Sequence, residues 1–163
     1  WNRIFLSSSR LHNETMNVYT HLLPMLYLVY HAWTVWTDTT WASGEWYRFL
    51  LLYYIGAAMF TTCSSSAYHL FSCVPSWNAT LLRIDMFGIA QLIVASYIVG
   101  LGSGFRCSQT LLGVYIAGLL GIIFAAIGML VHPHFQDPKW DMVKQLTLTS
   151  AVVYGVLPAG HWV

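Results

Sequence analysis

Apolar residues fill five long stretches of the chain, and polar residues gather between them. The stretches cover residues 18–36, 47–72, 84–101, 111–131 and 145–163. A helix needs about 20 apolar residues to cross the hydrocarbon core of a bilayer. Strands of a membrane barrel would alternate apolar and polar residues over about 10 positions, and no such alternation recurs. The pattern therefore predicts five transmembrane helices.

The stretches differ in clarity. Residues 111–131 carry no charge, whereas residues 145–163 contain hydroxyl residues and Pro158. The chain begins with Trp1 rather than methionine and ends inside apolar sequence. We therefore expect a fragment truncated at both ends, with residues 1–163 forming one partial membrane domain.

Composition narrows the class further. The chain is 57% hydrophobic and only 8% charged, whereas soluble domains carry about 25% charged residues. A water-soluble fold of this size could not bury so much apolar surface. The fold class is therefore all-α, a polytopic membrane helix bundle. The net charge of +1 offers no basic face, so no nucleic-acid partner is expected.

Basic residues in the polar segments predict the orientation. On the N-terminal side of the membrane lie Arg3, Arg10, Arg83, Lys139 and Lys144, and on the other side Arg48 and Arg106. The positive-inside rule places the richer side, and with it the N-terminus, in the cytoplasm. The glycosylation patterns at Asn13 and Asn78 fall on that side, so we expect neither to carry a glycan.

A polar stripe interrupts the second stretch. It consists of Thr62, Ser65, Ser66 and His69, whose spacing places them on one face of a helix. Polar groups in a membrane helix face the protein interior rather than lipid. We therefore expect this face to contact neighbouring helices.

The next stretch brings a carboxylate to the same side of the membrane. A polar loop over residues 73–83 would make the second and third helices antiparallel neighbours, so His69 and Asp85 can approach each other. Gly88, one turn deeper, would permit close packing.

Three interpretations of the His69–Asp85 pair stay open from the residues alone. The pair can be a structural hydrogen-bond network or a proton or ion relay as in a transporter. It can also be a zinc site, with His69 as ligand and Asp85 bound directly or through water. Zinc takes four ligands, and this chain offers one clear histidine.

A second motif, HNETMNVYTHLLP at residues 12–24, precedes the first stretch. Asn13 suits a helix N-cap and Glu14 suits the positive end of the helix dipole. Capping does not explain Asn17 and His21, which continue into the apolar sequence. This pattern indicates contacts with neighbouring helices, or alternatively an anchor at the membrane interface.

Four motifs in order resemble the progestin and adipoQ receptor family, which includes adiponectin receptors and haemolysin-III-like proteins. They are HNETMNVYTHLLP, SSSAYHLFSC, LLRIDMFGIA and GVLPAGHW. The resemblance implies seven helices, five of them in this chain, and a cytoplasmic N-terminus.

The resemblance also implies a zinc site near the cytoplasmic side. One zinc-binding histidine of the family matches His69, and its serine and aspartate match Ser65 and Asp85. Two further histidines, spaced H-x-x-x-H on the seventh helix, have no counterpart here. The remaining zinc ligands are therefore expected beyond Val163.

Three functions follow from the resemblance and the residues. The first is a zinc-containing receptor linked to lipid signalling or to zinc and sterol homeostasis, with membrane lipid and an extracellular ligand as partners. The second is a zinc-dependent lipid amide hydrolase similar to alkaline ceramidases, in which Asp85 and Ser65 are catalytic. The third is a transporter or pore whose His–Asp network is structural.

Overall fold

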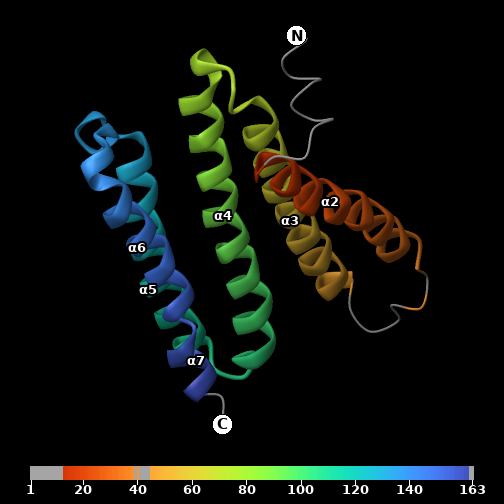
Figure 1. Ribbon diagram of the computed structural model, residues 1–163. Coiled ribbons are helices and arrows are strands. Elements are labelled where there is room, and N and C mark those ends of the chain that lie inside the picture. Colours follow the sequence, from red (N-terminus) through yellow and green to blue (C-terminus); the bar gives the residue numbers. More distant parts are fainter. Residues whose placement is uncertain (1–12, 39, 41–44, 162–163) are drawn as a thin grey trace. The chain divides into compact units, whose positions relative to one another are not determined.

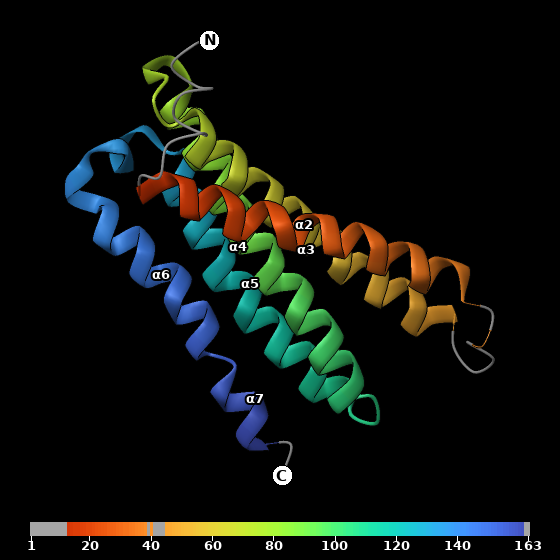
Figure 2. The same cartoon turned by 45° about the vertical axis from the view of Figure 1, so that its right-hand side comes forward.

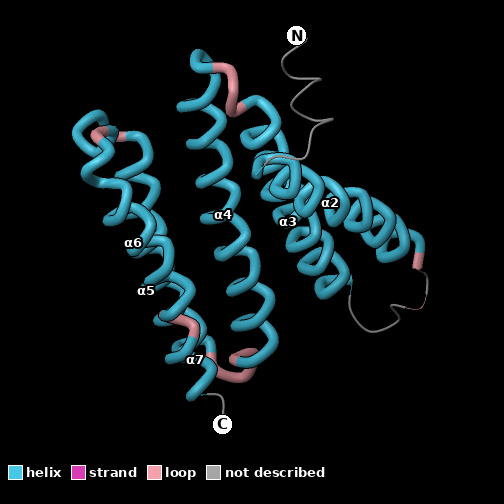
Figure 3. The backbone as a smooth tube through the Cα atoms, viewed as in Figure 1, coloured by secondary structure: helices cyan, strands magenta, loops and turns pink. Residues whose placement is uncertain are grey.

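The computed structural model describes residues 13–38, 40 and 45–161 (Figure 1). The helices are α2 (Asn13–Thr37), α3 (Glu45–Phe71), α4 (Pro75–Gly104), α5 (Gln109–Val131), α6 (Asp141–Val153) and α7 (Val156–His161), with short 3-10 helices η1 (Pro133–Gln136) and η2 (Pro138–Trp140). Within these residues there is no strand, and short loops or turns join the helices from α3 onward (Figure 3). The predicted all-α class is confirmed.

Three helices of the described chain are long and apolar enough to cross a membrane. They are Trp46–Phe71, Pro75–Gly104 and Gln109–Val131. α2 covers the predicted first span, and its first turns carry the polar motif, which lowers its mean hydropathy. Arg3 and Arg10, used for the predicted orientation, lie outside the described residues, as does the side chain of Asn13.

The connection between α3 and α4 is shorter than predicted. The predicted loop over residues 73–83 is wrong, because α4 already begins at Pro75. Proline is accepted in the first turn of a helix, where its missing N–H would have no partner. The side-chain amide of Asn78 donates to the Ser72 carbonyl at 3.1 Å. Polar residues had suggested a loop, yet they lie on helical turns.

The predicted span at residues 145–163 is divided into two helices. α6 ends at Val153, and α7 begins at Val156. Pro158 has no N–H to donate to the Tyr154 carbonyl, which accepts from the N–H of Leu157 at 3.1 Å instead. A proline inside a helix therefore breaks the regular bonding here.

A tyrosine of α4 donates a hydrogen bond to one of the backbone carbonyls that this break leaves without its helical donor. In a regular helix the Ala151 carbonyl would accept from the N–H of Gly155. That N–H donates instead to Val152 at 3.1 Å, and the Tyr97 hydroxyl donates to Ala151 at 2.8 Å. Freed backbone groups in membrane helices are commonly satisfied by neighbouring side chains in this way.

The chain forms two compact units, residues 1–89 and 90–163. In the first unit, α2 runs alongside α3 (Figures 1 and 2). In the second, α5 packs against α6. The core of the second unit includes the fully or almost fully buried Ala95, Leu119, Ile123, Ala126 and Ala151.

Candidate functional site

The polar stripe of α3 lies largely inside the first unit. Ser65 and Ser66 are buried, with exposed fractions of 6% and 8%. The Ser66 hydroxyl donates to the Val18 carbonyl of α2 at 3.4 Å. Thr62 instead donates to Ala58 of its own helix. The predicted inward orientation is therefore confirmed for the two serines.

α4 approaches α3 closely at Gly88. The Thr61 hydroxyl donates to the Gly88 carbonyl at 2.8 Å. A Cβ at position 88 would lie 3.0 Å from Ser64 Oγ and 3.1 Å from Thr61 Cα. The prediction that Gly88 permits close packing is confirmed.

This approach brings Asp85 beside the serines of α3. Asp85 is only 7% exposed, and its carboxyl lies close enough to the Ser65 side chain to interact with it. His69 and His21 are near enough to act electrostatically on the same carboxyl. The structure thus brings together all three residues that the sequence selected, Ser65, His69 and Asp85.

His69 makes its shortest polar contact with α2 rather than α4. His69 Nδ1 lies 2.6 Å from Glu14 Oε2, and their side chains are 20% and 41% exposed. Asn17 Nδ2 lies 3.4 Å from the same Glu14 oxygen and 3.5 Å from His69 Nδ1. The start of the first motif and the end of the polar stripe therefore form one cluster.

Two aromatic rings flank His69. The ring of His21 is nearly parallel to it, with centroids 6.1 Å apart and an interplanar angle of 5°. The Tyr68 ring lies 5.1 Å away at 57°. The His21 contact bears out the expectation that residues of the first motif meet a neighbouring helix.

Glu14 is the site residue that sequence reasoning assigned to another role. Its position in the first turn of α2 suits the helix dipole, which is a sufficient local explanation. The available signal was the excess of polar residues after it, namely Asn17 and His21. That excess indicated an interhelical contact without naming the partner.

The chemistry of the cluster fits one metal ligand. His69 Nδ1 is held by Glu14, whereas Nε2 makes no hydrogen bond to any residue described in the structure. Metal-binding histidines typically bind through one nitrogen and donate the other N–H to a carboxylate. Within the described residues, no three histidine, cysteine or acidic side chains gather as a metal site. Among the described residues, the cluster therefore offers one histidine whose surroundings match those of a metal ligand.

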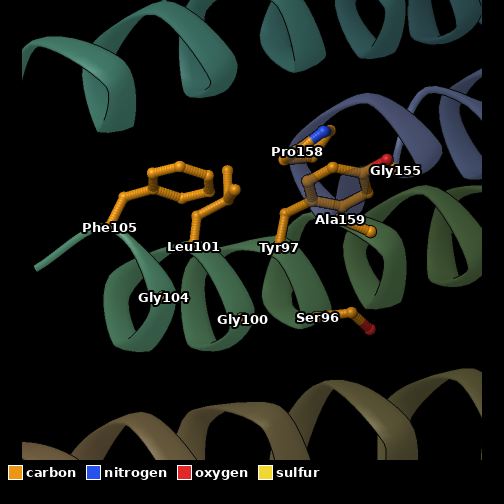
Figure 4. A pocket seen from close by; sticks show the side chains of 9 residues that line it. All are labelled: Ser96, Tyr97, Gly100, Leu101, Gly104, Phe105, Gly155, Pro158 and Ala159. Carbon is orange, nitrogen blue, oxygen red and sulfur yellow. The ribbon is translucent and has the colours of Figure 1, made fainter. Parts of the chain in front are cut away.

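A separate groove of about 300 Å³ lies in the second unit (Figure 4). Tyr97 and Leu101 of α4, with Phe105 directly after it, line the groove on one side, and Pro158 of α7 lines it on the other (Figure 4). Its lining is mostly apolar and contains no acidic or histidine side chain. The titratable cluster belongs to the first unit, so the groove is not the site of that chemistry.

The fold and this cluster define a class, an integral multi-pass membrane protein with buried polar and ionisable residues between its helices. The family described as Haemolysin-III related matches residues 9–163. The chain belongs to this family.

Named relatives agree with this assignment. Heptahelical transmembrane protein 1 of Arabidopsis thaliana is 30% identical over 96% of the chain and 50% of its own length. Progestin and adipoQ receptor family member 3 of Homo sapiens is 30% identical over 94% of the chain and 50% of its own length. An adiponectin receptor protein of Drosophila melanogaster is 27% identical over 97% of the chain and 36% of its own length. The chain thus spans about half the length of the first two relatives.

Proposed function

We propose that this chain is part of a zinc-containing seven-helix receptor of the adiponectin and progestin receptor type, acting in lipid signalling. The observation that carries the proposal is the cluster of Ser65, His69 and Asp85 in the first unit. Names of relatives such as the adiponectin receptor protein of Drosophila melanogaster supply the receptor assignment. The ligand class is a membrane lipid or an extracellular protein ligand.

His69 would hold the zinc ion through Nε2, together with ligands from other parts of the full-length protein. The cluster supports this role, because Glu14 engages Nδ1 at 2.6 Å. Zinc, when bound, supplies a Lewis acid that polarises a carbonyl and activates water. The buried Ser65 hydroxyl and Asp85 carboxylate would then lie beside the zinc-activated water.

We further propose that the site hydrolyses a lipid amide. Asp85 would accept the proton that a water molecule loses as it attacks the amide carbonyl, and would return it to the nitrogen as the carbon–nitrogen bond breaks and the amine leaves. The Ser65 hydroxyl, which lies near the Asp85 carboxyl, would donate to that carboxyl and fix its orientation. The burial of both side chains, at 6% and 7% exposure, excludes bulk water and strengthens each interaction.

Zinc analysis of the purified full-length protein, beside ceramide turnover, tests both proposals. His69→Ala should lower zinc content to background, because it removes a ligand. Asp85→Asn should retain most of the zinc and lose hydrolysis. Ser65→Ala should have the mildest effect on zinc. His134→Ala is the control, because this exposed histidine contacts Phe135 and Trp140 outside the cluster.

The outcomes separate the alternatives. Full zinc content in His69→Ala would overturn the metal assignment and favour a structural His–Asp network. Zinc loss in His69→Ala, with no turnover by the wild type, would favour a receptor whose zinc is structural.

A further inference from the structure

The short contact between Glu14 and His69 joins two motifs that lie far apart in the chain. It connects the first turn of α2 to the last turn of α3. The distance of 2.6 Å between Glu14 Oε2 and His69 Nδ1 is at the short end for a hydrogen bond, as charge-assisted bonds are.

The hydrogen-bonding capacities of the groups decide where the proton lies. An ionised carboxylate only accepts, so His69 Nδ1 must carry the proton in this contact. The Asn17 amide nitrogen, which only donates, can then bond to Glu14 at 3.4 Å but not to the protonated Nδ1. Both groups therefore donate to the same Glu14 oxygen.

We propose that Glu14 is a positioning residue that fixes His69 as the tautomer protonated at Nδ1, leaving the lone pair on Nε2. Neutral imidazole has one donor and one acceptor nitrogen, so fixing the first determines the second. The hydrogen bond and the flanking His21 ring also restrict rotation of the imidazole. The effect of Glu14 on metal binding rests on the zinc function proposed above. The assignment of the His69 tautomer does not depend on that function.

A purely local role for Glu14 can be separated from this one. Asp141 also occupies the first turn of a helix, α6, and pairs with Lys144 of the same helix at 2.7 Å. Both acids complement a helix dipole, but only Glu14 contacts the histidine. Asp141→Asn is therefore the matched control for removing a first-turn charge.

The experiment uses the full-length protein and three variants, Glu14→Ala, Glu14→Gln and Asp141→Asn. Zinc affinity is measured by competition with a chelator. Loss of a carboxylate that orients a ligating histidine typically lowers metal affinity about 10–100-fold, and we expect this loss for Glu14→Ala. Glu14→Gln keeps an acceptor oxygen without the charge and should give a smaller loss. Asp141→Asn should match the wild type.

The second readout is the nitrogen NMR spectrum of His69 in the chelator-treated protein. We expect protonation at Nδ1 in the wild type and a shift toward Nε2 protonation in Glu14→Ala. If Glu14→Ala does not fold, Glu14→Gln serves for both readouts, since its side chain has the same size.

Failure of the proposed zinc function and failure of the positioning role of Glu14 give different results. A wild type without zinc would overturn the metal function, and the NMR spectrum would still decide the role of Glu14. Protonation of His69 at Nε2 in the wild type, or equal zinc affinity in the Glu14 and Asp141 variants, would overturn the positioning role.

Discussion

Gly88 shows how a single missing side chain sets the approach of two helices. Of the atoms near a Cβ at this position, Thr61 Cα at 3.1 Å belongs to the backbone of α3. A flexible side chain such as that of Ser64 can rotate away, whereas a backbone atom moves only with its helix. The contact also supports the hydrogen bond from Thr61 to the Gly88 carbonyl.

We therefore predict that Gly88→Ala destabilises the protein. Overpacking a close contact costs about 1–3 kcal/mol, and the helix propensity of alanine returns about 1 kcal/mol at most. The net effect should lower the unfolding temperature in detergent. Gly56→Ala is the control, because nothing lies within 4 Å of its Cβ position. A Gly88→Ala protein at least as stable as the control would contradict this prediction.

The sequence predicted some site residues and assigned Glu14 differently, for a physical reason. Ser65, His69 and Asp85 are polar groups inside apolar stretches, so their cost in a membrane marks them individually. Glu14 stands at a helix start, where a charge is ordinary. Its true partner lies 55 residues away, and local patterns do not state which helices pair.

Among the elements, the divided helix at residues 141–161 depends on Tyr97. We predict that Tyr97→Phe lowers stability by about 1 kcal/mol, because the Ala151 carbonyl loses its donor. Hydrogen exchange should increase locally, at residues 154–156. Tyr53→Phe, which removes the hydroxyl of a 40% exposed ring, is the control. Equal changes in the two variants would show that the bond to Ala151 contributes nothing specific.

The connection between α5 and α6 depends on Asp137. The backbone N–H of Lys139 donates to Asp137 Oδ1 at 3.0 Å, and the Lys139 ammonium lies 3.1 Å from Oδ2. These two contacts, the backbone bond first, hold the pKa of Asp137 below its ordinary value. A lowered folded-state pKa stabilises the fold above the unfolded pKa, and this stabilisation is lost as the pH falls through the folded value.

We predict that this connection loosens in acid. At pH 7 the Lys139 amide should be better protected from exchange in the wild type than in Asp137→Ala. As the pH falls below the lowered folded-state pKa of Asp137, the carboxyl becomes protonated and the two protection factors should converge. A difference that persists unchanged in acid would assign the effect to side-chain size rather than charge.

At the scale of elements, apolar length predicted the helices well and their ends poorly. The stretch 111–131 differs from α5 by two residues at one end, since α5 is Gln109–Val131. α4 extends to Pro75 because helical hydrogen bonds continue through polar turns that a bilayer would exclude. The division near Tyr154 follows from Pro158, which removes a backbone hydrogen bond. A count of apolar residues does not include this effect.

At the scale of the whole molecule, the orientation in the membrane determines from which side of the membrane a ligand can reach the cluster of Glu14, His69 and Asp85. The chain carries test groups at both ends of α4, because Cys73 precedes Pro75 and Cys107 follows Gly104. Both thiols are exposed. The Cys63 thiol is exposed as well, but it lies inside α3, which is long and apolar enough to cross a membrane, so we expect lipid to shield it from water-soluble reagents.

We predict that a membrane-impermeant thiol reagent added to the non-cytoplasmic side of sealed membranes modifies Cys107 and spares Cys73. This follows from the excess of basic residues on the N-terminal side, which places that side in the cytoplasm. Single-cysteine variants of the full-length protein isolate each signal, and permeabilised membranes should allow modification of Cys73 while Cys63 stays unmodified. Modification of Cys73 in sealed membranes, with Cys107 protected until permeabilisation, would reverse the orientation. The cluster of Glu14, His69 and Asp85 would then face the outside, where an extracellular ligand could reach it directly.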